Sequence, residues 1–288
     1  MRWEGRRQSR NIEDRRGRRV SRGVVGGGAG MIVLALIALL FGVDPGAMME
    51  GQPMDGQPAP DGPAAEAPYT GSPEEERLRD FVGVVLASTE DTWHTLFERR
   101  GGTYREPTLV LFTGAVESAC GFAQAAVGPF YCPADHRVYL DLSFFEDMET
   151  QLRAPGDFAQ AYVIAHEVGH HVQTLLGVSE QVHRQRSRLG GAAANELSVR
   201  QELQADCFAG VWAHHAERAR PLLESGDIEE GLNAASAIGD DRLQMQSQGY
   251  VSPESFTHGS SAQRARWFRT GLDTGDLNRC DTFAAASL

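Results

Sequence analysis

The chain has 288 residues, of which 41% are hydrophobic and 23% charged, a composition ordinary for a globular protein that can build a core. Its formal net charge of −12 argues against nucleic acid as a partner, because phosphate binding requires a basic surface. The sequence has no internal repeat at a fixed period, which excludes solenoid and propeller architectures.

The start of the chain has the charge pattern of a membrane anchor. Residues 1–23 contain nine Arg against Glu4, Glu13 and Asp14, so the remainder carries a net charge of −18. Residues 24–43 are uncharged and long enough to span a bilayer. An uncleaved transmembrane helix is favoured over a signal peptide, since no small-x-small cleavage site follows closely. The positive-inside rule then predicts a single crossing of the inner membrane, with a cytoplasmic N-terminus and everything after the anchor in the periplasm or outside the cell.

A flexible linker is expected at residues 44–71, where Pro, Gly, Ala and Met dominate and large apolar residues are few. The stretch Ser72-Pro73-Glu74-Glu75 then predicts a helix start, with Ser72 as the N-cap, Pro at the first helical position and Glu at the third. The folded domain is therefore expected to cover residues 72–288.

Two β-like segments follow this helix, "TLVLFTGAV" from Thr108 and "RVYLDLSFF" from Arg137. The chain after them turns helical, and capping-box spacing predicts further helix starts at Asp157, Asp227 and Ser260. Strands followed by helices indicate an α+β fold, mostly helical with a small sheet.

All four cysteines, Cys120, Cys132, Cys207 and Cys280, follow the expected anchor. An even number in an oxidising compartment indicates two disulfides. Cys120 and Cys132 bracket a loop that contains Gly and Pro, which favours their pairing and leaves Cys207 for Cys280, although the sequence allows three connectivities. Metal binding by the cysteines is disfavoured because no Cys-x-x-Cys pair occurs, and buried free thiols are the other alternative.

The segment "AYVIAHEVGHHVQTLLG" at residues 161–177 contains a His-Glu-x-x-His spacing on an apolar helix. His166 and His170 lie one turn apart on one face, where both rings can bind one Zn²⁺. Glu167 lies beside them and can take a proton from zinc-bound water and pass it to a leaving amine. The alternative is a helix whose histidines only form hydrogen bonds, and it predicts no third ligand.

A third ligand is available on a second apolar helix, where Glu202 and Asp206 are again four residues apart. Glu202 can complete the ligand set and leave the fourth position to water, while Asp206 can accept the second ring N–H of a ligand histidine and fix its tautomer. The alternative, a solvated acidic edge, fits poorly beside apolar neighbours. His171, His214 and His215 are then expected at the surface or in supporting positions rather than as ligands.

The pair His166-Glu-x-x-His170 and Glu202-Leu-Gln-Ala-Asp206 resembles the gluzincin metallopeptidases. In detail, nearly the whole chain is similar to the bacterial neutral zinc metallopeptidases of the YpfJ type, including "MRWEGRRQSRNIEDRRG", "SACGFAQAAVGPFYCPADHRVYLDLSFF", "ELQADCFAGVW" and "HGSSAQRARWF". This resemblance implies a membrane-anchored, zincin-like protein with Zn²⁺ on His166, His170 and Glu202 and with Glu167 as the catalytic residue.

A further segment, "THGSSAQR", is similar to the Thr-His-Pro…Arg element of HtpX-like gluzincins, with Gly259 where that element has Pro. The likeness implies that His258 and Arg264 lie near the metal and help to hold substrate or the oxyanion, with Arg264 expected, like Asp206, in a supporting position behind the ligands. The alternative for His258 is an ordinary loop histidine. Resemblance to zincins also suggests that the segment from Arg137 is an edge strand on which a peptide substrate pairs. The alternative is an interior strand.

Two functions follow from these patterns. The leading hypothesis is a zinc-dependent endopeptidase that acts on proteins or peptides near the membrane. The second is a non-catalytic, zinc-stabilised module that tethers partners at the membrane, and the similarity of residues 1–17 to the family, beyond what topology requires, favours it.

Overall fold

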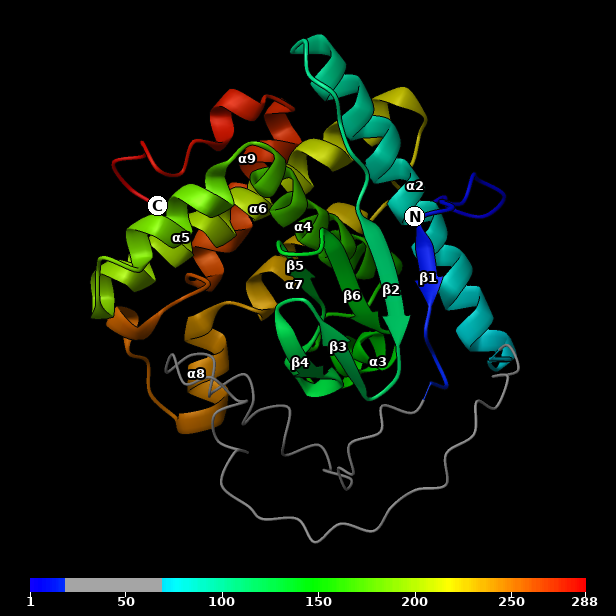
Figure 1. Ribbon diagram of the computed structural model, residues 1–288, viewed down its shortest axis with the longest axis horizontal. Coiled ribbons are helices and arrows are strands. Elements are labelled where there is room, and N and C mark those ends of the chain that lie inside the picture. Colours follow the sequence, from blue (N-terminus) through cyan, green and yellow to red (C-terminus); the bar gives the residue numbers. More distant parts are fainter. Residues whose placement is uncertain (19–68) are drawn as a thin grey trace, which may run out of the picture.

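The computed structural model describes residues 1–18 and 69–288 of the chain (Figure 1). The transmembrane segment expected at 24–43 and nearly all of the linker expected at 44–71 lie outside these described residues. Within the described ranges, none of the helices combines the length and the apolar composition that a membrane crossing requires.

The fold is α+β and mostly helical with a small sheet, as the sequence predicts. The helices are α2 (Pro73–Arg99), α3 (Ser143–Thr150), α4 (Asp157–Leu175), α5 (Val178–Arg186), α6 (Gly191–Ala219), α7 (Asp227–Ala237), α8 (Asp240–Gln248) and α9 (Ser261–Thr274). The strands are β1 (Ile12–Asp14), β2 (Thr108–Phe112), β3 (Ala115–Ser118), β4 (Gly121–Gln124), β5 (Phe130–Cys132) and β6 (Arg137–Asp141).

The main sheet has the strand order β1-β2-β6-β5, with β1, β2 and β6 parallel and β5 antiparallel to β6. β3 and β4 form a separate antiparallel hairpin. The segment from Arg137 is therefore an interior strand, the second of the two alternatives that the sequence left open, and not the edge strand suggested by the zincin resemblance. The reason is the short strand β5, which turns back onto β6 through a tight loop and takes the edge position itself.

The N-terminal segment, residues 1–18, packs on the domain that was expected to begin only at residue 72. β1 pairs with β2, the Trp3 ring lies edge-on to Phe81 with ring centroids 5.4 Å apart, and Met1 is buried. Arg16 is also buried, where it forms ion pairs with Asp14 and Glu76. Because β1 is hydrogen-bonded to β2, the N-terminal segment belongs to the same folded unit as β2.

Two of the predicted helix caps are present and two are not. Ser72 and Ser260 both form complete capping boxes. Asp157 and Asp227 instead occupy the first helical position after a glycine and accept no capping hydrogen bond. Their carboxylates form ion pairs with the α-amino group of Met1, at 2.6 and 3.4 Å, which explains why they are not used as caps.

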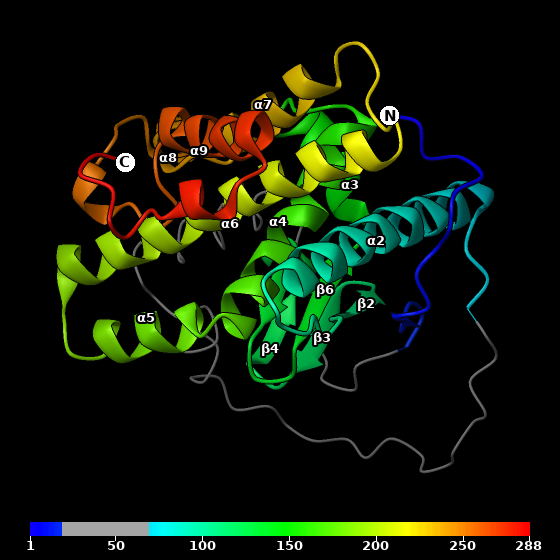
Figure 2. The same ribbon diagram turned by 90° about the horizontal axis from the view of Figure 1, so that it is seen from above.

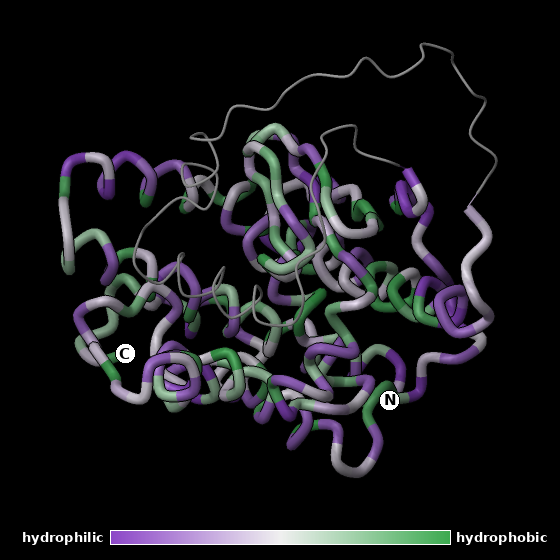
Figure 3. The backbone as a smooth tube through the Cα atoms, turned by 90° about the horizontal axis from the view of Figure 1, so that it is seen from below, coloured by the Kyte–Doolittle hydropathy of each residue, from purple (hydrophilic) through white to green (hydrophobic). Residues whose placement is uncertain are grey.

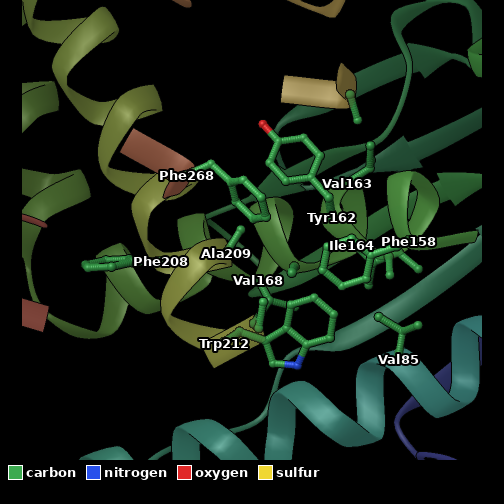
Figure 4. Close-up of a cluster of buried hydrophobic side chains, with 14 of the residues drawn as sticks. Val85, Phe158, Tyr162, Val163, Ile164, Val168, Phe208, Ala209, Trp212 and Phe268 are labelled. Atoms are coloured by element: carbon green, nitrogen blue, oxygen red, sulfur yellow. The ribbon is translucent and has the colours of Figure 1, made fainter. Parts of the chain in front are cut away.

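The core surrounds α4 and α6, the two helices that carry the candidate metal ligands. α6 runs the length of the molecule with α9 on one side and α4 on the other (Figure 2). The α6–α9 crossing is so tight that a Cβ at Gly271 would lie 1.9 Å from the carbonyl oxygen of Cys207. Buried aromatic side chains fill the space between the helices, with Phe158 stacked on Trp212 and Phe268 edge-on to Tyr162 (Figure 4). Hydrophilic positions dominate the outlying helix α5, whereas apolar positions follow the inner segments (Figure 3).

Candidate metal centre

The three predicted metal ligands meet where α4 crosses α6. α4 carries His166 and His170, and α6 carries Glu202; their donor atoms all lie within 4.8 Å of one another. Gly169 permits this close crossing, because a Cβ at that position would lie only 3.0 Å from the carbonyl oxygen of Ala205.

The distances between the donor atoms fit a tetrahedral zinc site. Glu202 Oε2 lies 3.2 Å from His166 Nε2, and Oε1 lies 3.4 Å from His170 Nε2. Zinc bonds of about 2.0–2.1 Å at tetrahedral angles place neighbouring ligand atoms about 3.3 Å apart. Two imidazoles and one carboxylate are also a donor set that zinc enzymes use, so these residues could hold the ion and leave one position open.

The electrostatics of the site favour a cation at the two imidazoles. Burial lowers the pKa of His166, but the charge and hydrogen bonds of Asp206 and Glu202 outweigh it and raise that pKa to about 9. Burial likewise lowers the pKa of His170, but the charge of Glu202 outweighs this effect, so the pKa is raised. A positive charge at these nitrogens is therefore stabilised, and a bound divalent cation would provide one.

Asp206 is fully buried behind His166. Its Oδ1 accepts a hydrogen bond from His166 Nδ1 at 2.8 Å and another from the Tyr162 hydroxyl. Arg264 donates to both carboxylate oxygens, from Nε and Nη2 at 2.9 Å each. Burial opposes ionisation of Asp206, but the Arg264 charge lowers its pKa to about 2. Asp206 is thus an anion whose hydrogen bond to Nδ1 of His166 leaves Nε2 of that ring directed toward Glu202.

Arg264 contacts Asp206, a supporting position of the kind expected for it. Its side chain is only 2% exposed and its guanidinium group is bound mainly to Asp206. Arg264 therefore holds the residue that orients His166, and this leaves little of the guanidinium group to contact a substrate.

His170 is held by Gln173, a residue outside the motifs that indicated the ligands. Gln173 Oε1 lies 2.9 Å from His170 Nδ1, while Gln173 Nε2 donates to the Gln201 carbonyl at 2.7 Å. Gln173 is fully buried. Gln173 therefore fixes the ring orientation of His170, as Asp206 does for His166. Its position three residues after His170, on the same helical face, is the sequence feature that could have indicated this contact.

Glu167 is the one acidic group of the site without a partner. It is 8% exposed, faces the same pocket as the ligands, and makes no hydrogen bond or ion pair with any described residue. Burial raises its pKa. A desolvated carboxylate that is not engaged elsewhere is well suited to take up and release a proton.

His258 also lines this pocket, from the loop before α9. Its Nδ1 lies 3.1 Å from Asp240 Oδ1, and the other oxygen of Asp240 accepts the backbone N–H groups of Thr257, His258 and Gly259. Asp240 was not anticipated, because a buried aspartate that caps a distant loop leaves no local pattern. Gly259 has a φ of +90°, which proline cannot adopt, so the turn differs from the Thr-His-Pro element it resembles.

The pocket has a volume of about 400 Å³ and is open to solvent beside the metal position. Phe130 and Tyr131 of β5 form one wall, and apolar residues Val127, Phe144, Leu152, Ile238 and Leu243 surround the polar groups. A volume of this size can take part of an extended peptide with one side chain enclosed.

The remaining candidate residues lie outside the centre. His171 is fully buried and bonds to the Tyr131 hydroxyl and the Arg105 carbonyl, so it connects α4 to the sheet region and is not a surface residue. His214 and His215 are near the far end of α6 and bond to backbone carbonyls. Both predicted disulfides, Cys120–Cys132 and Cys207–Cys280, are formed.

Sequence comparison agrees with this geometry. The model of the family described as "Putative neutral zinc metallopeptidase" matches residues 1–283. The chain belongs to this family. The protein of Escherichia coli K12 named "Uncharacterized protein YpfJ" is 50% identical over 294 residues, which cover 98% of this chain and 99% of that protein. "Uncharacterized protein Rv2575" of Mycobacterium tuberculosis H37Rv is 43% identical over 261 residues, 87% of this chain and 86% of that one. No solved structure matches the chain significantly.

Membership of this family confirms the predicted resemblance to neutral zinc metallopeptidases, and the description of the family implies zinc as the metal. The family match also begins at residue 1 and so includes the N-terminal segment that forms β1. The N-terminal segment is therefore part of the region that defines the family, which agrees with its packing on the domain.

Proposed function

We propose that this protein is a zinc-dependent peptidase in which His166, His170 and Glu202 hold the metal. The observation that carries the proposal is the partnerless carboxylate of Glu167, which opens onto the same pocket as the three ligands. A zinc ion bound there would act as a Lewis acid on the scissile carbonyl and make water more acidic.

The residues of the chain have distinct roles in this reaction. Glu167 accepts a proton from the attacking water and transfers it to the leaving amine, for which its burial-raised pKa is suited. His258 donates a hydrogen bond to the developing oxyanion, with its ring oriented by Asp240. Asp206 and Gln173 keep the two ligand imidazoles in position throughout.

The substrate is an extended segment of protein or peptide. Among the strands that the structure describes, β5 pairs with β6 alone, and its residues Phe130 and Tyr131 line the pocket. The free edge of β5 can pair with a peptide backbone, and this brings the peptide across the metal position. Internal peptide bonds then suit the site better than chain ends, which supports an endopeptidase.

A non-catalytic, zinc-stabilised module is the competing function, and the pocket argues against it. Structural zinc sites are normally closed by four protein ligands. Here three ligands face an open pocket that also contains an unengaged carboxylate and an oriented imidazole. A purely structural site has no use for either group.

We further propose that the protein acts at a membrane in an oxidising compartment, the periplasm or the cell exterior. The uncharged residues 24–43 support membrane attachment, and two disulfides support the compartment. A single crossing with a cytoplasmic N-terminus does not agree with the β1–β2 pairing, so both described parts of the chain are assigned to one side.

Zinc content and cleavage of an unfolded protein, measured on the same preparations, test the proposal. Full-length wild type should hold one zinc per chain and cleave, whereas His166→Ala and Glu202→Ala should lose both properties. Glu196→Ala, an exposed carboxylate on the same helix, should retain both and serves as the matched control. Zinc retained at full occupancy in Glu202→Ala would reject this ligand set.

A further inference from the structure

A second pocket lies near the C-terminal end of α6 and shares no lining residue with the metal centre. Its volume is about 620 Å³, within the range of small-molecule sites. At 1.5 Å per residue, Arg218 is about 24 Å along α6 from Glu202. Its walls come from the N-terminal segment, α2, α6 and the end of α9, four parts of the chain that are distant in sequence.

The lining of this pocket is strongly basic in a chain whose net charge is −12. Five arginines and two histidines line it, together with a single acidic residue, Asp91; the basic residues are Arg6, Arg7, Arg99, His214, His215, Arg218 and Arg220. Asp91 is already bound to Arg7, with 2.7 Å between Oδ1 and Nη2. Among the described residues, Arg99, Arg218 and Arg220 have no carboxylate partner.

The hydrogen bonds of the histidines keep this charge uncompensated. His214 donates from Nδ1 to the Leu272 carbonyl at 2.7 Å, so its Nε2 is free to accept from Arg218 Nη1 at 3.1 Å. The Arg218 guanidinium group is thus oriented by the imidazole of His214 and not by an acidic side chain. His215 donates from Nε2 to the Gly275 carbonyl at 2.9 Å.

The neighbouring groups respond to this excess of positive charge. Burial lowers the pKa of Arg6, and the nearby charge of Arg220 lowers it further. Burial also lowers the pKa of His215, to which the charges of Arg99 and Arg218 contribute. Arginines near helix C-termini are common because they stabilise the helix dipole. That role explains Arg99 and Arg218, which lie in the last turns of α2 and α6. It does not explain why Arg6 and Arg220 line the same pocket.

We propose that this pocket binds a phosphate-bearing ligand. A phosphate monoester carries about −1.5 to −2 charges and three acceptor oxygens at neutral pH, so one group can engage two or three guanidinium forks. A single carboxylate could neutralise only one of the three unpaired arginines. The phosphate comes either from a small soluble molecule or from a lipid headgroup, and both present the same chemistry.

Calorimetric titration of the full-length protein at constant ionic strength tests this site, with pyrophosphate, inorganic phosphate and glycerol 3-phosphate as probes. Wild type should bind at least one probe saturably, and R218A/R220A should bind it at least about tenfold more weakly, since charge-assisted hydrogen bonds are lost. The double variant R186A/R188A removes two equally exposed arginines outside the pocket and should bind like wild type. Any phosphate binding at the metal centre is the same in all three proteins.

The outcomes separate the sources and the alternatives. Tighter binding of pyrophosphate indicates a soluble ligand, whereas tighter binding of glycerol 3-phosphate indicates a lipid headgroup; both support the proposal. Saturable binding of none of the probes, or equal binding by R218A/R220A, would overturn it. An oligoglutamate peptide that binds more tightly than every phosphate probe would also overturn it, in favour of an acidic protein partner.

Discussion

The substitution Asp206→Asn examines how the metal centre is supported. Asp206 is completely buried and accepts hydrogen bonds from Tyr162, His166 and twice from Arg264. Asparagine keeps the size of the side chain and can still accept from His166 Nδ1. It removes the negative charge, however, and leaves the guanidinium group of Arg264, itself 2% exposed, without a counter-ion.

The expected loss has two separate parts. An uncompensated buried charge costs about 3–5 kcal/mol, a large fraction of the free energy of unfolding of an ordinary domain. Weaker orientation of His166 should in addition lower the zinc affinity by about 10–100-fold. The first part is independent of the metal, and the second appears only when zinc is bound.

Urea unfolding in a chelator and in excess zinc measures both parts. In the chelator, Asp206→Asn should unfold with a free energy about 3–5 kcal/mol below that of wild type. The double variant Asp206→Asn/Arg264→Met removes both charges and should be less destabilised than Asp206→Asn alone. Asp273→Asn, an exposed control on α9, should change stability by less than about 0.5 kcal/mol. A loss below about 1 kcal/mol for Asp206→Asn would refute the reasoning.

Three further predictions concern other parts of the chain. Gln173→Leu should lower zinc affinity by about 10–100-fold in a competition assay with a chromophoric chelator, and an unchanged affinity would mean that Gln173 does not position His170. Glu4→Cys and Arg186→Cys should react with an impermeant maleimide from the same side of the membrane, since the native cysteines are all in disulfides; labelling from opposite sides would contradict the β1–β2 pairing. Replacing Cys207 and Cys280 by serine opens a 73-residue loop and should lower the unfolding free energy by about 4 kcal/mol in chemical denaturation, whereas no loss would exclude a structural role for this disulfide.

The meeting of the proposed ligands could be predicted in part because each half of the set is local. His166 and His170, and likewise Glu202 and Asp206, are four residues apart on one helix, and helical periodicity alone places each pair on one face. The capping boxes at Ser72 and Ser260 are equally local and are present. Asp157 and Asp227 have the same spacing, but a tertiary partner, the Met1 amino group, takes their carboxylates.

Features that depend on distant contacts were not predictable. Asp240 orients His258 from 18 residues away, and nothing in the spacing signals it. The N-terminal segment was separated from the domain because its arginines matched a topology signal, whereas Arg7 and Arg16 form ion pairs within the fold. β5 is only three residues long, too short for an alternating pattern, so the sequence alone cannot decide whether its neighbour β6 is an edge or an interior strand.

The comparison of Glu167→Gln with wild type at equal zinc occupancy tests the central claim most directly. Both full-length proteins are loaded to one zinc per chain and incubated with a broad panel of unfolded proteins, and cleavage products are identified by mass spectrometry. We expect cleavage by wild type and a loss of at least about 10²-fold in Glu167→Gln, because the proton acceptor is removed while the ligands remain. Zinc-loaded wild type that cleaves nothing, or a Glu167→Gln variant that cleaves as fast, would contradict the account.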